Sequence, residues 1–436
     1  MDRIERKIVE IIDANAANLI KDGRELFASA ERGFAEYDTA RKTAEKLRAM
    51  GIEVRENLAV TGVKGMIGKG DGPTVSVIGE LDGIMCAEHP QAVAGTGMSH
   101  SCGHNAQMTG MLGAALALSD PEVAASLDGR VAIFAVPAEE YLPADVREGL
   151  KNQGAIRYYS GKSELVRLGE FDDIDLCLTT HAHMVPDAQC DLLLGNNSVS
   201  GFIGKTAVFK GKAAHAAAAP HAGVNALNAA SLGLAALGMI RETFREKDYI
   251  RVHPVMRSGG GAVNVVPQEA VLDMMVRAKT LDAITEASAK TDRAFRGAAA
   301  AIGAEVAIRD AQGYMPVIER EGDQVLFDAA ALLGSSLSVK GITPGIQNAA
   351  STDAGDLTHL MPVLNFTFGG SVGALHSRDF TVTDEELFYV TPAKLLALTT
   401  YRLLRGGARE AGAILDGFTP VFTKEAYLRQ IESLHK

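Results

Sequence analysis

Side chains that can bind a metal ion or move a proton follow four short apolar segments of the sequence. The segments are TVSVIG (residues 74–79), RVAIFAV (130–136), LCLTT (176–180) and PVLNFTF (362–368). After them come Glu80 and Asp82, Glu139 and Glu140, His181, and His376. In an open sheet of parallel strands, ligands bind outside the carboxyl ends of the strands. If each segment is a strand, the four ends bring these side chains into one site.

A cysteine and a histidine two positions apart lie between the first two segments. Cys102 and His104 belong to SHSCGHNAQ, just before a predicted helix of small and apolar residues. In isolation, Cys102 is explained equally well as packing filler, and His104 as a histidine satisfied by hydrogen bonds. With Glu140, His181 and His376 they make five ligands of sulfur, nitrogen and oxygen, enough for two metal ions that share a bridge. We expect two divalent ions per chain, zinc or manganese first, with cobalt or nickel as alternatives.

The adjacent acids Glu139 and Glu140 can have two different roles. Neighbouring carboxylates at a strand end point in different directions, so one can bind a metal ion while the other stays free as a general base for a water molecule. The alternative is a solvated acidic turn, which is the common setting of a Glu-Glu pair. The buried strand predicted directly before the pair favours the first interpretation.

Two further residues are weaker candidates. His183 lies two positions after His181 and would share its face in an extended segment, but we expect it beside the site or exposed. Arg277, in MMVRAK near the end of a predicted strand, could clamp a substrate carboxylate through two hydrogen bonds, although a surface arginine on a strand is as common.

The elements that position these residues follow from the hydrophobic pattern. Continuous rather than alternating hydrophobicity indicates strands buried on both faces, so the four segments predict the parallel core of an α/β sheet with helices on both faces. Apolar residues at helical spacing in the first 50 residues indicate two amphipathic helices. The predicted fold class is therefore α/β, with a mixed, mostly parallel sheet in the catalytic domain.

A different pattern interrupts this sheet between residues 200 and 312. Alternating strands and two helices follow one another there as β-α-β-β-α-β, which is typical of a ferredoxin-like α+β unit. We expect a catalytic domain made of residues 1–199 and 313–436, and a lid and dimerisation domain made of residues 200–312. The Ala- and Leu-rich helix predicted over residues 226–240 has apolar faces that suit a homodimer.

Composition narrows the possible partners and location. The 436 residues are 47% hydrophobic and carry 43 Lys and Arg against 54 Asp and Glu, a formal net charge of −11. Without any basic run, this argues against binding to nucleic acid or to an anionic membrane. The charged N-terminus has no apolar signal region, no apolar window reaches membrane-spanning length, and four cysteines are too few for a disulfide scaffold. We expect a cytoplasmic protein.

Eight segments resemble the M20 family of metallo-amidohydrolases and peptidases, in the branch that carries a Cys-Gly-His motif. They recur in the family's order over roughly residues 20–400, which is nearly the whole chain. The segments are GELDG (79–83), SHSCGHNAQ (99–107), PAEE (137–140), FDDIDLCLTTH (171–181), FKGKAAHAAAAPHAGVNAL (209–227), SGGGAVNVVP (258–267), STDAGDLTH (351–359) and ALHSRDF (374–380).

The resemblance implies roles for particular residues. The metal ligands it implies are Cys102, His104, Glu140, His181 and His376. It makes Glu139 the base and His215, from its own or a partner subunit, a donor that polarises the scissile carbonyl. Asn264 would hydrogen-bond the substrate, and Asp82 would orient the ligands. The chain departs from many relatives in Asn105, where they have Asp, and in GELDGIM, where they have a RADMDALP-like segment.

These groups support metal-assisted hydrolysis of an amide bond. The resemblance implies N-acyl or N-aroyl amino acids or short peptides as substrates, with a dipeptidase or carboxypeptidase of the same family as an alternative. A hydrolase with Cys102 as nucleophile is a second alternative, although it leaves the two glutamates and His376 unexplained. A catalytically silent binding protein of the same fold is the third.

Overall fold

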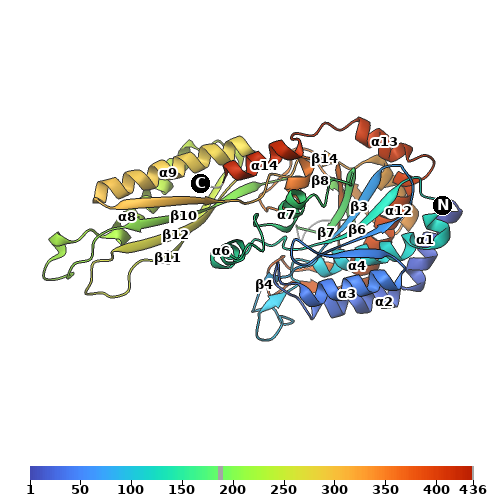
Figure 1. Cartoon of the computed structure of the whole chain (residues 1–436), viewed down its shortest axis with the longest axis horizontal. Helices are drawn as coiled ribbons and strands as arrows, with labels where there is room; N and C mark the ends of the chain where they lie inside the picture. The colour runs from blue at the N-terminus through green and yellow to red at the C-terminus, as the bar shows by residue number, and fades with distance from the viewer. Residues whose placement is uncertain (185–189, 435–436) are drawn as a thin grey trace. The chain divides into compact units, whose positions relative to one another are not determined.

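A computed structural model describes residues 1–184 and 190–434 of the chain. They form two compact units (Figure 1). The large unit comprises residues 1–197, 318–345 and 356–421, and the small unit residues 198–317, 346–355 and 422–436. Among the described residues, no helix is both long and apolar enough to cross a membrane.

The large unit is built on a nine-stranded mixed sheet in the order β1-β2-β6-β3-β7-β17-β8-β14, with β15 also paired to β8. The four central strands β6, β3, β7 and β17 are parallel, and antiparallel pairs flank them on both sides. These four are the segments that the apolar pattern predicted. The strands are β1 Glu53–Leu58, β2 Gly62–Ile67, β3 Thr74–Glu80, β6 Arg130–Val136, β7 Leu176–Ala182, β8 Leu192–Asn196, β14 Arg320–Glu321, β15 Val339–Gly341 and β17 Val363–Phe368.

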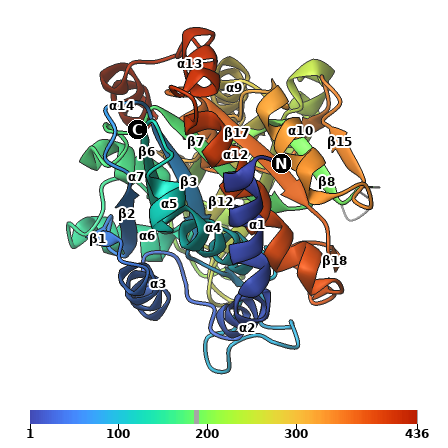
Figure 2. The ribbon, with the colours of Figure 1, turned by 90° about the vertical axis from the view of Figure 1, so that its right-hand side faces the viewer.

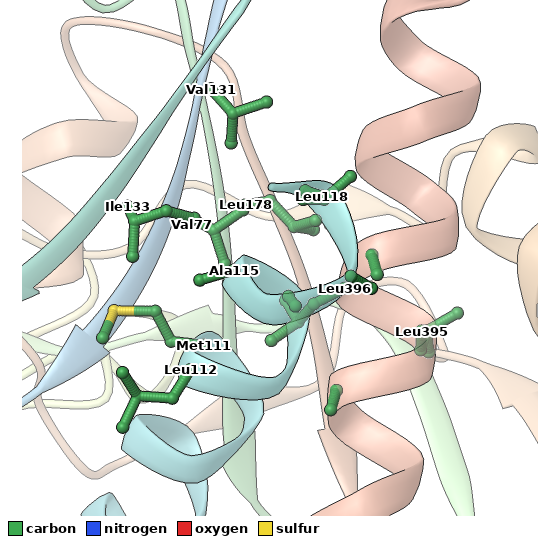
Figure 3. Close-up of a cluster of buried hydrophobic side chains, with 14 of the residues drawn as sticks. Val77, Met111, Leu112, Ala115, Leu118, Val131, Ile133, Leu178, Leu395 and Leu396 are labelled. Carbon is green, nitrogen blue, oxygen red and sulfur yellow. The ribbon is translucent and has the colours of Figure 1, made fainter. Parts of the chain in front are cut away.

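Helices α4 and α12 supply the core against this sheet. Figure 3 shows Met111, Leu112, Ala115 and Leu118 of α4 between strand residues such as Val77 and the side chains of α12. Nearly every residue of α4 is buried, because α1, α2 and α12 also pack on it (Figure 2). The helices of this unit are α1 Arg3–Ala14, α2 Ala16–Phe27, α3 Tyr37–Ala49, α4 His104–Leu118, α5 Pro121–Ala124, α6 Ala144–Asn152, α7 Gly161–Leu168, α10 Gln324–Ala330, α12 Thr391–Leu404 and α13 Arg409–Asp416.

The first 50 residues form three helices, where the sequence pattern predicted two. A capping box starts α1, in which Asp2 and Glu5 exchange hydrogen bonds between side chain and backbone. The chain turns at Asn15 and continues directly as α2, which buries Leu19 and Phe27. No glycine or proline marks this junction, so the sequence carries no signal for the break.

The small unit has the predicted β-α-β-β-α-β order. Its four strands form an antiparallel sheet in the order β11-β12-β10-β13, and α8 and α9 pack on it around Phe209 and Phe295. Its elements are β10 Gly201–Lys210, α8 Ala226–Ile240, β11 Arg251–Ser258, β12 Glu269–Ala278, α9 Leu281–Ile302, β13 Glu305–Ala311 and α14 Lys424–Ser433. Other short strands and helices of the chain are β4 Ile84–Met85, β5 Met98–Ser99, β9 Ser198–Val199, β16 Gln347–Asn348, α11 Ala354–Thr358, β18 Ser371–Val372 and β19 Thr381–Val382.

Candidate metal centre

The predicted site residues of the large unit meet where the central parallel strands end. Cys102 and His104 stand at the start of α4, on either side of Gly103, whose φ of +88° lies in the left-handed region. A Cβ at Gly103 would come 2.8 Å from the Cβ of Ala182, so the position is closed to larger residues both by conformation and by space. This glycine lets two ligands separated by one residue approach the same place.

Two overlapping groups of ligand atoms share the sulfur of Cys102. The Sγ of Cys102 lies 3.5 Å from Nε2 of His181 and 3.1 Å from Nε2 of His376. His376 Nε2 is also 3.1 Å from Oε1 of Glu140. One group is Cys102, His104 and His181, and the other is Cys102, Glu140 and His376, with the ligand atoms of each group within 4.8 Å of one another.

Hydrogen bonds to backbone carbonyls determine which ring nitrogen of each histidine can bind a metal ion. His104 donates Nδ1–H to the carbonyl of Asp82 at 2.8 Å, and His181 donates Nδ1–H to the carbonyl of Ala182 at 2.8 Å. In the neutral ring, Nε2 then keeps its lone pair. Hydrogen bonds of this kind to the second ring nitrogen are usual for histidines that bind metal ions. Both histidines are therefore prepared as Nε2 ligands.

Two buried carboxyl groups hold the segment that carries Glu139 and Glu140. Asp82 Oδ2 accepts the backbone N–H of Glu140 at 2.9 Å, and Glu36 Oε1 accepts that of Ala138 at 2.8 Å. Ala138 has a φ of +47°, a strained conformation that these contacts help to maintain. Burial, reinforced by the nearby charge of Asp82, raises the pKa of Glu36 to about 8. Asp82 thus contacts the ligand segment as an orienting residue would.

Glu139 lies among the ligands rather than in solvent. The residue is 7% exposed, and its Oε2 is 3.9 Å from Nε2 of His104. This burial does not fit a solvated acidic turn. Glu139, His104 and Glu80 form a third group whose ligand atoms lie within 4.8 Å of one another.

Burial and charge set the protonation of the cluster. Burial and the neighbouring Glu140 raise the pKa of the Cys102 thiol well above its ordinary value. Burial lowers the pKa of His104, but Cys102 and Glu80 outweigh it and raise that pKa well above the usual value. Burial and His104 lower the pKa of His181. A reactive cysteine nucleophile needs a lowered pKa, so this setting argues against Cys102 in that role.

The donor set fits divalent metal ions. Ligands about 2.0 to 2.3 Å from one zinc ion in tetrahedral geometry lie roughly 3.3 to 3.7 Å apart, close to the separations around Cys102. Within residues 1–184 and 190–434, no hydrogen bond satisfies the buried atoms Glu80 Oε2, His104 Nε2 and Glu140 Oε1. Buried polar atoms of this kind are costly unless a partner such as a metal ion binds them.

One pairing in the site was not predicted. Glu80 was expected at the site as an acid at a strand end but was given no role there, and its Oε2 lies 3.2 Å from Nε2 of His104. Its Oε1 accepts a hydrogen bond of 2.6 Å from Lys162, at the start of α7, whose side chain is fully buried. A lysine 22 residues after Glu140 carries no sequence signal that would place it beside Glu80.

His183 lies outside the three ligand groups. Its Nδ1 is 2.7 Å from the hydroxyl of Thr367, and its Nε2 is 2.9 Å from the carbonyl of Cys190. Both ring nitrogens therefore have partners other than the candidate ligands, as expected for a residue beside the site.

The remaining candidates lie in the small unit. His215 and Asn264 are neighbours, because His215 bridges to Val265 and the carbonyl of Asn264 accepts the N–H of Ala216 at 3.0 Å. Nδ1 of His215 accepts the N–H groups of Ala217 and Ala218, so the neutral ring carries its proton on Nε2.

Arg277 is tied to other residues of the small unit. Its guanidinium donates to the hydroxyl of Ser351 at 3.0 Å and lies 5.2 Å from the ring centre of Phe202. The side chain is half-buried, and burial lowers its pKa. Neither of these contacts is with a carboxylate, so they leave the charge of Arg277 uncompensated, as a substrate clamp would require.

Fold and cluster together define an α/β protein with a candidate site for divalent metal ions. Comparison with known proteins also points to a metal-binding α/β protein. Residues 197–301 match the family model described as a peptidase dimerisation domain. The chain is 27% identical to one of the subunits of the p-aminobenzoyl-glutamate hydrolase of Escherichia coli over 415 residues, covering 92% of this chain and 80% of the relative.

Two other similar proteins are also peptidases by name. Xaa-Arg dipeptidase of Mus musculus is 30% identical over 317 residues, covering 69% of this chain and 66% of the relative. A dinuclear metal-binding peptidase of the M20 family from Bacillus subtilis has the same fold, with a TM-score of 0.62 at 20% identity over 90% of this chain and 99% of that one. The chain belongs to the M20 family, as its motifs indicated, and it is a hydrolase of that family.

Proposed function

We propose that the protein hydrolyses the amide bond of N-acyl or N-aroyl amino acids with the help of two divalent metal ions. The observation that carries this proposal is the convergence of five donors, Cys102, His104, Glu140, His181 and His376, beside the buried carboxylate of Glu139. When bound, the ions would lower the pKa of a water molecule and polarise the scissile carbonyl. Zinc suits the thiolate, and manganese the carboxylates.

Glu139 has the position of a general base. It takes a proton from the attacking water as the oxygen forms its bond to the carbonyl carbon. Glu139 then delivers that proton to the amine nitrogen as the carbon–nitrogen bond breaks, which leaves a carboxylic acid and an amine. Because Asp82 and Glu36 hold the backbone on either side of it, Glu139 is kept close to its working position.

His215 and Asn264 act on the substrate from the small unit. The Nε2–H of His215 donates to the carbonyl oxygen as negative charge develops there, and the two backbone N–H groups on Nδ1 keep the proton on Nε2. Asn264 hydrogen-bonds the substrate, and Arg277 binds a carboxylate of it. We propose that the small unit also joins two chains into a homodimer, which its match to a dimerisation domain supports.

Within this class, p-aminobenzoyl-glutamate is our first candidate substrate. The relative with that substrate in its name aligns over 92% of this chain, and the segments GELDG, CGHN and STDAGD favour the same type. A dipeptidase activity is the second candidate, supported by the 30% identity to Xaa-Arg dipeptidase. A cytoplasmic location and independence from nucleic acid and membranes stay predictions from composition.

Metal content per chain is the decisive measurement. We expect about two ions per chain by plasma mass spectrometry, after purification without chelator or after reloading with zinc or manganese. The Cys102→Ala variant should lose them, and the loaded protein should release amine from N-acyl or N-aroyl amino acids. A protein that takes up no metal under either condition would contradict the proposed function.

A further inference from the structure

A fully buried ion pair lies against the metal centre. Lys162 Nζ donates to Oε1 of Glu80 at 2.6 Å, and neither side chain is more than 4% exposed. The backbone N–H of Glu80 donates to the side-chain carbonyl of Gln107, so the residue is anchored at the end of β3. The Glu80 carboxylate is therefore held in place inside the protein by contacts on its backbone and on one of its oxygens.

The second oxygen of this carboxylate faces the candidate ligands. Oε2 of Glu80 is 3.2 Å from Nε2 of His104, the nitrogen that faces away from the carbonyl of Asp82. Among the described residues, no hydrogen bond satisfies this oxygen or that nitrogen. Glu139 lies in the same group of ligand atoms. A buried carboxylate oxygen and an imidazole nitrogen at this separation are placed to share one metal ion.

We propose that Glu80 is a sixth ligand of the metal centre, and that Lys162 is the counter-ion that fixes it in that role. The inference rests on the proposed function. Lys162 holds Oε1 and so aims Oε2 at the ion beside His104. It also adds a positive charge that balances the extra carboxylate, so the centre gains an oxygen ligand without gaining net negative charge.

This assignment changes the donors around the ion beside His104. The group of Cys102, Glu140 and His376 already contains a carboxylate, whereas the group of Cys102, His104 and His181 offers only sulfur and nitrogen. Glu80 adds a carboxylate oxygen beside His104, and carboxylate oxygens suit harder ions such as manganese. Glu80 should therefore matter more for Mn²⁺ than for Zn²⁺.

The test is calorimetric titration of the metal-stripped full chain with Mn²⁺ and, separately, with Zn²⁺. Glu80→Gln should weaken Mn²⁺ binding at one site at least tenfold and Zn²⁺ binding less. Lys162→Met should weaken Mn²⁺ binding as well. The double variant Lys162→Met with Glu80→Gln should lose no more affinity than the single Glu80→Gln variant, because the two residues act as one unit.

A matched control is Lys64→Met. Lys64 is also a buried lysine of the large unit, but it pairs with Asp173 and with the carbonyl of Glu170. The Lys64→Met variant should bind both ions as the wild type does. The double variant also guards against misfolding, because it removes both charges of the Glu80–Lys162 pair together, and circular dichroism checks that each variant is folded.

Three results would overturn the inference. The first is a folded Glu80→Gln variant with wild-type affinity for both ions. The second is a double variant whose loss equals the product of the two single losses. The third is an equal loss of Mn²⁺ and Zn²⁺ affinity. If the wild type itself binds no metal, it is the proposed function that fails, so the two failures are distinguishable.

Discussion

Contacts with other residues hold the candidate ligand side chains of this protein in place. Asp82 holds two of them. Its backbone carbonyl accepts Nδ1–H of His104, and its carboxylate accepts the backbone N–H of Glu140. A rotation of Asp82 would disturb a histidine and a glutamate that lie far apart in the sequence. Loss of a contact behind a metal ligand commonly weakens metal affinity about tenfold or more.

Glu139 and Glu140 should separate catalysis from metal binding. Glu139→Gln keeps the shape of the side chain but cannot accept a proton, so we expect turnover to fall by about 10²- to 10⁴-fold with the metal content unchanged. Glu140→Gln, its neighbour, should instead lose metal. Turnover is measured by amine release and metal content by mass spectrometry on the same preparations. A Glu139→Gln variant with near-native turnover would rule out its role as the base.

Glu36 should make stability depend on pH. Because its pKa is raised to about 8 in the folded chain but is ordinary in the unfolded chain, the folded state binds the extra proton between these values. This residue's contribution to the free energy of unfolding is therefore present at low pH and is lost as the pH rises towards about 8. Glu36→Gln keeps an acceptor for Ala138 and removes the titration.

Urea unfolding of the metal-free protein, at about pH 5 and at about pH 8, measures the effect. The wild type should lose more stability over this interval than Glu36→Gln does. Other groups titrate in both proteins, so the difference between them isolates Glu36. Parallel pH profiles for the two proteins would contradict the assignment of a protonated Glu36.

At the scale of elements, the sequence predicted the strands best and the contacts between distant elements least. The four apolar segments are the adjacent parallel strands β6, β3, β7 and β17, because continuous burial leaves a clear pattern. Once these strands were recognised, the residues at their ends could be assigned to one site, because the ends of parallel strands lie together. Lys162 and Glu36 could not, since each reaches the site from a helix or its start, whose packing depends on side chains throughout the core. Helix α2 was missed because nothing in the sequence separates it from α1.

The turn into α4 should be intolerant of a side chain. Gly103→Ala imposes a φ that costs an L-residue about 1 to 2 kcal/mol, and its Cβ would press on Ala182. We expect a loss of stability together with weaker metal binding, because Cys102 and His104 flank the glycine. Urea unfolding and metal titration measure the two effects.

Gly149→Ala is the matched control for this substitution. Gly149 lies inside α6, and among the described residues no atom from outside its own helix comes within 4 Å of an added Cβ. Alanine there should stabilise the protein by about 0.5 to 1 kcal/mol and leave metal binding unchanged, since glycine is unfavourable in a helix interior. If both alanine variants behaved alike, the conformation of Gly103 would have no special importance.

At the scale of the whole molecule, the small unit exposes several large apolar side chains. Leu232 and Met239 of α8 and Val255 of β11 are 39%, 75% and 57% exposed. Since β11 is also the edge strand of its sheet, this unit can join a second copy through side chains and backbone. We expect Met239→Glu with Val255→Asp to convert a dimer to a monomer in light scattering. Tyr37→Glu, at an exposed apolar residue of the large unit, should remain dimeric.

In a dimer, His215 can act at the site of its own chain or at the site of its partner. The family resemblance implies that this donor is often supplied by the partner subunit. We expect Glu139→Gln and His215→Ala to be inactive separately. When the two variants are unfolded and refolded together, mixed dimers form with one site that combines an intact Glu139 with a partner's intact His215. Activity should then return, in proportion to the fraction of mixed dimers.

The double variant Glu139→Gln with His215→Ala, refolded with wild type, is the reference for this experiment. Its mixed dimers contain no site that combines an intact Glu139 with an intact His215 from the other chain. Those dimers should therefore be inactive, and only the wild-type dimers in the mixture should turn over substrate. Mixtures of the two single variants that stay inactive, while light scattering shows that dimers have formed, would place His215 on the site of its own chain. The resulting assignment decides whether dimer formation completes the active site or only stabilises the small unit.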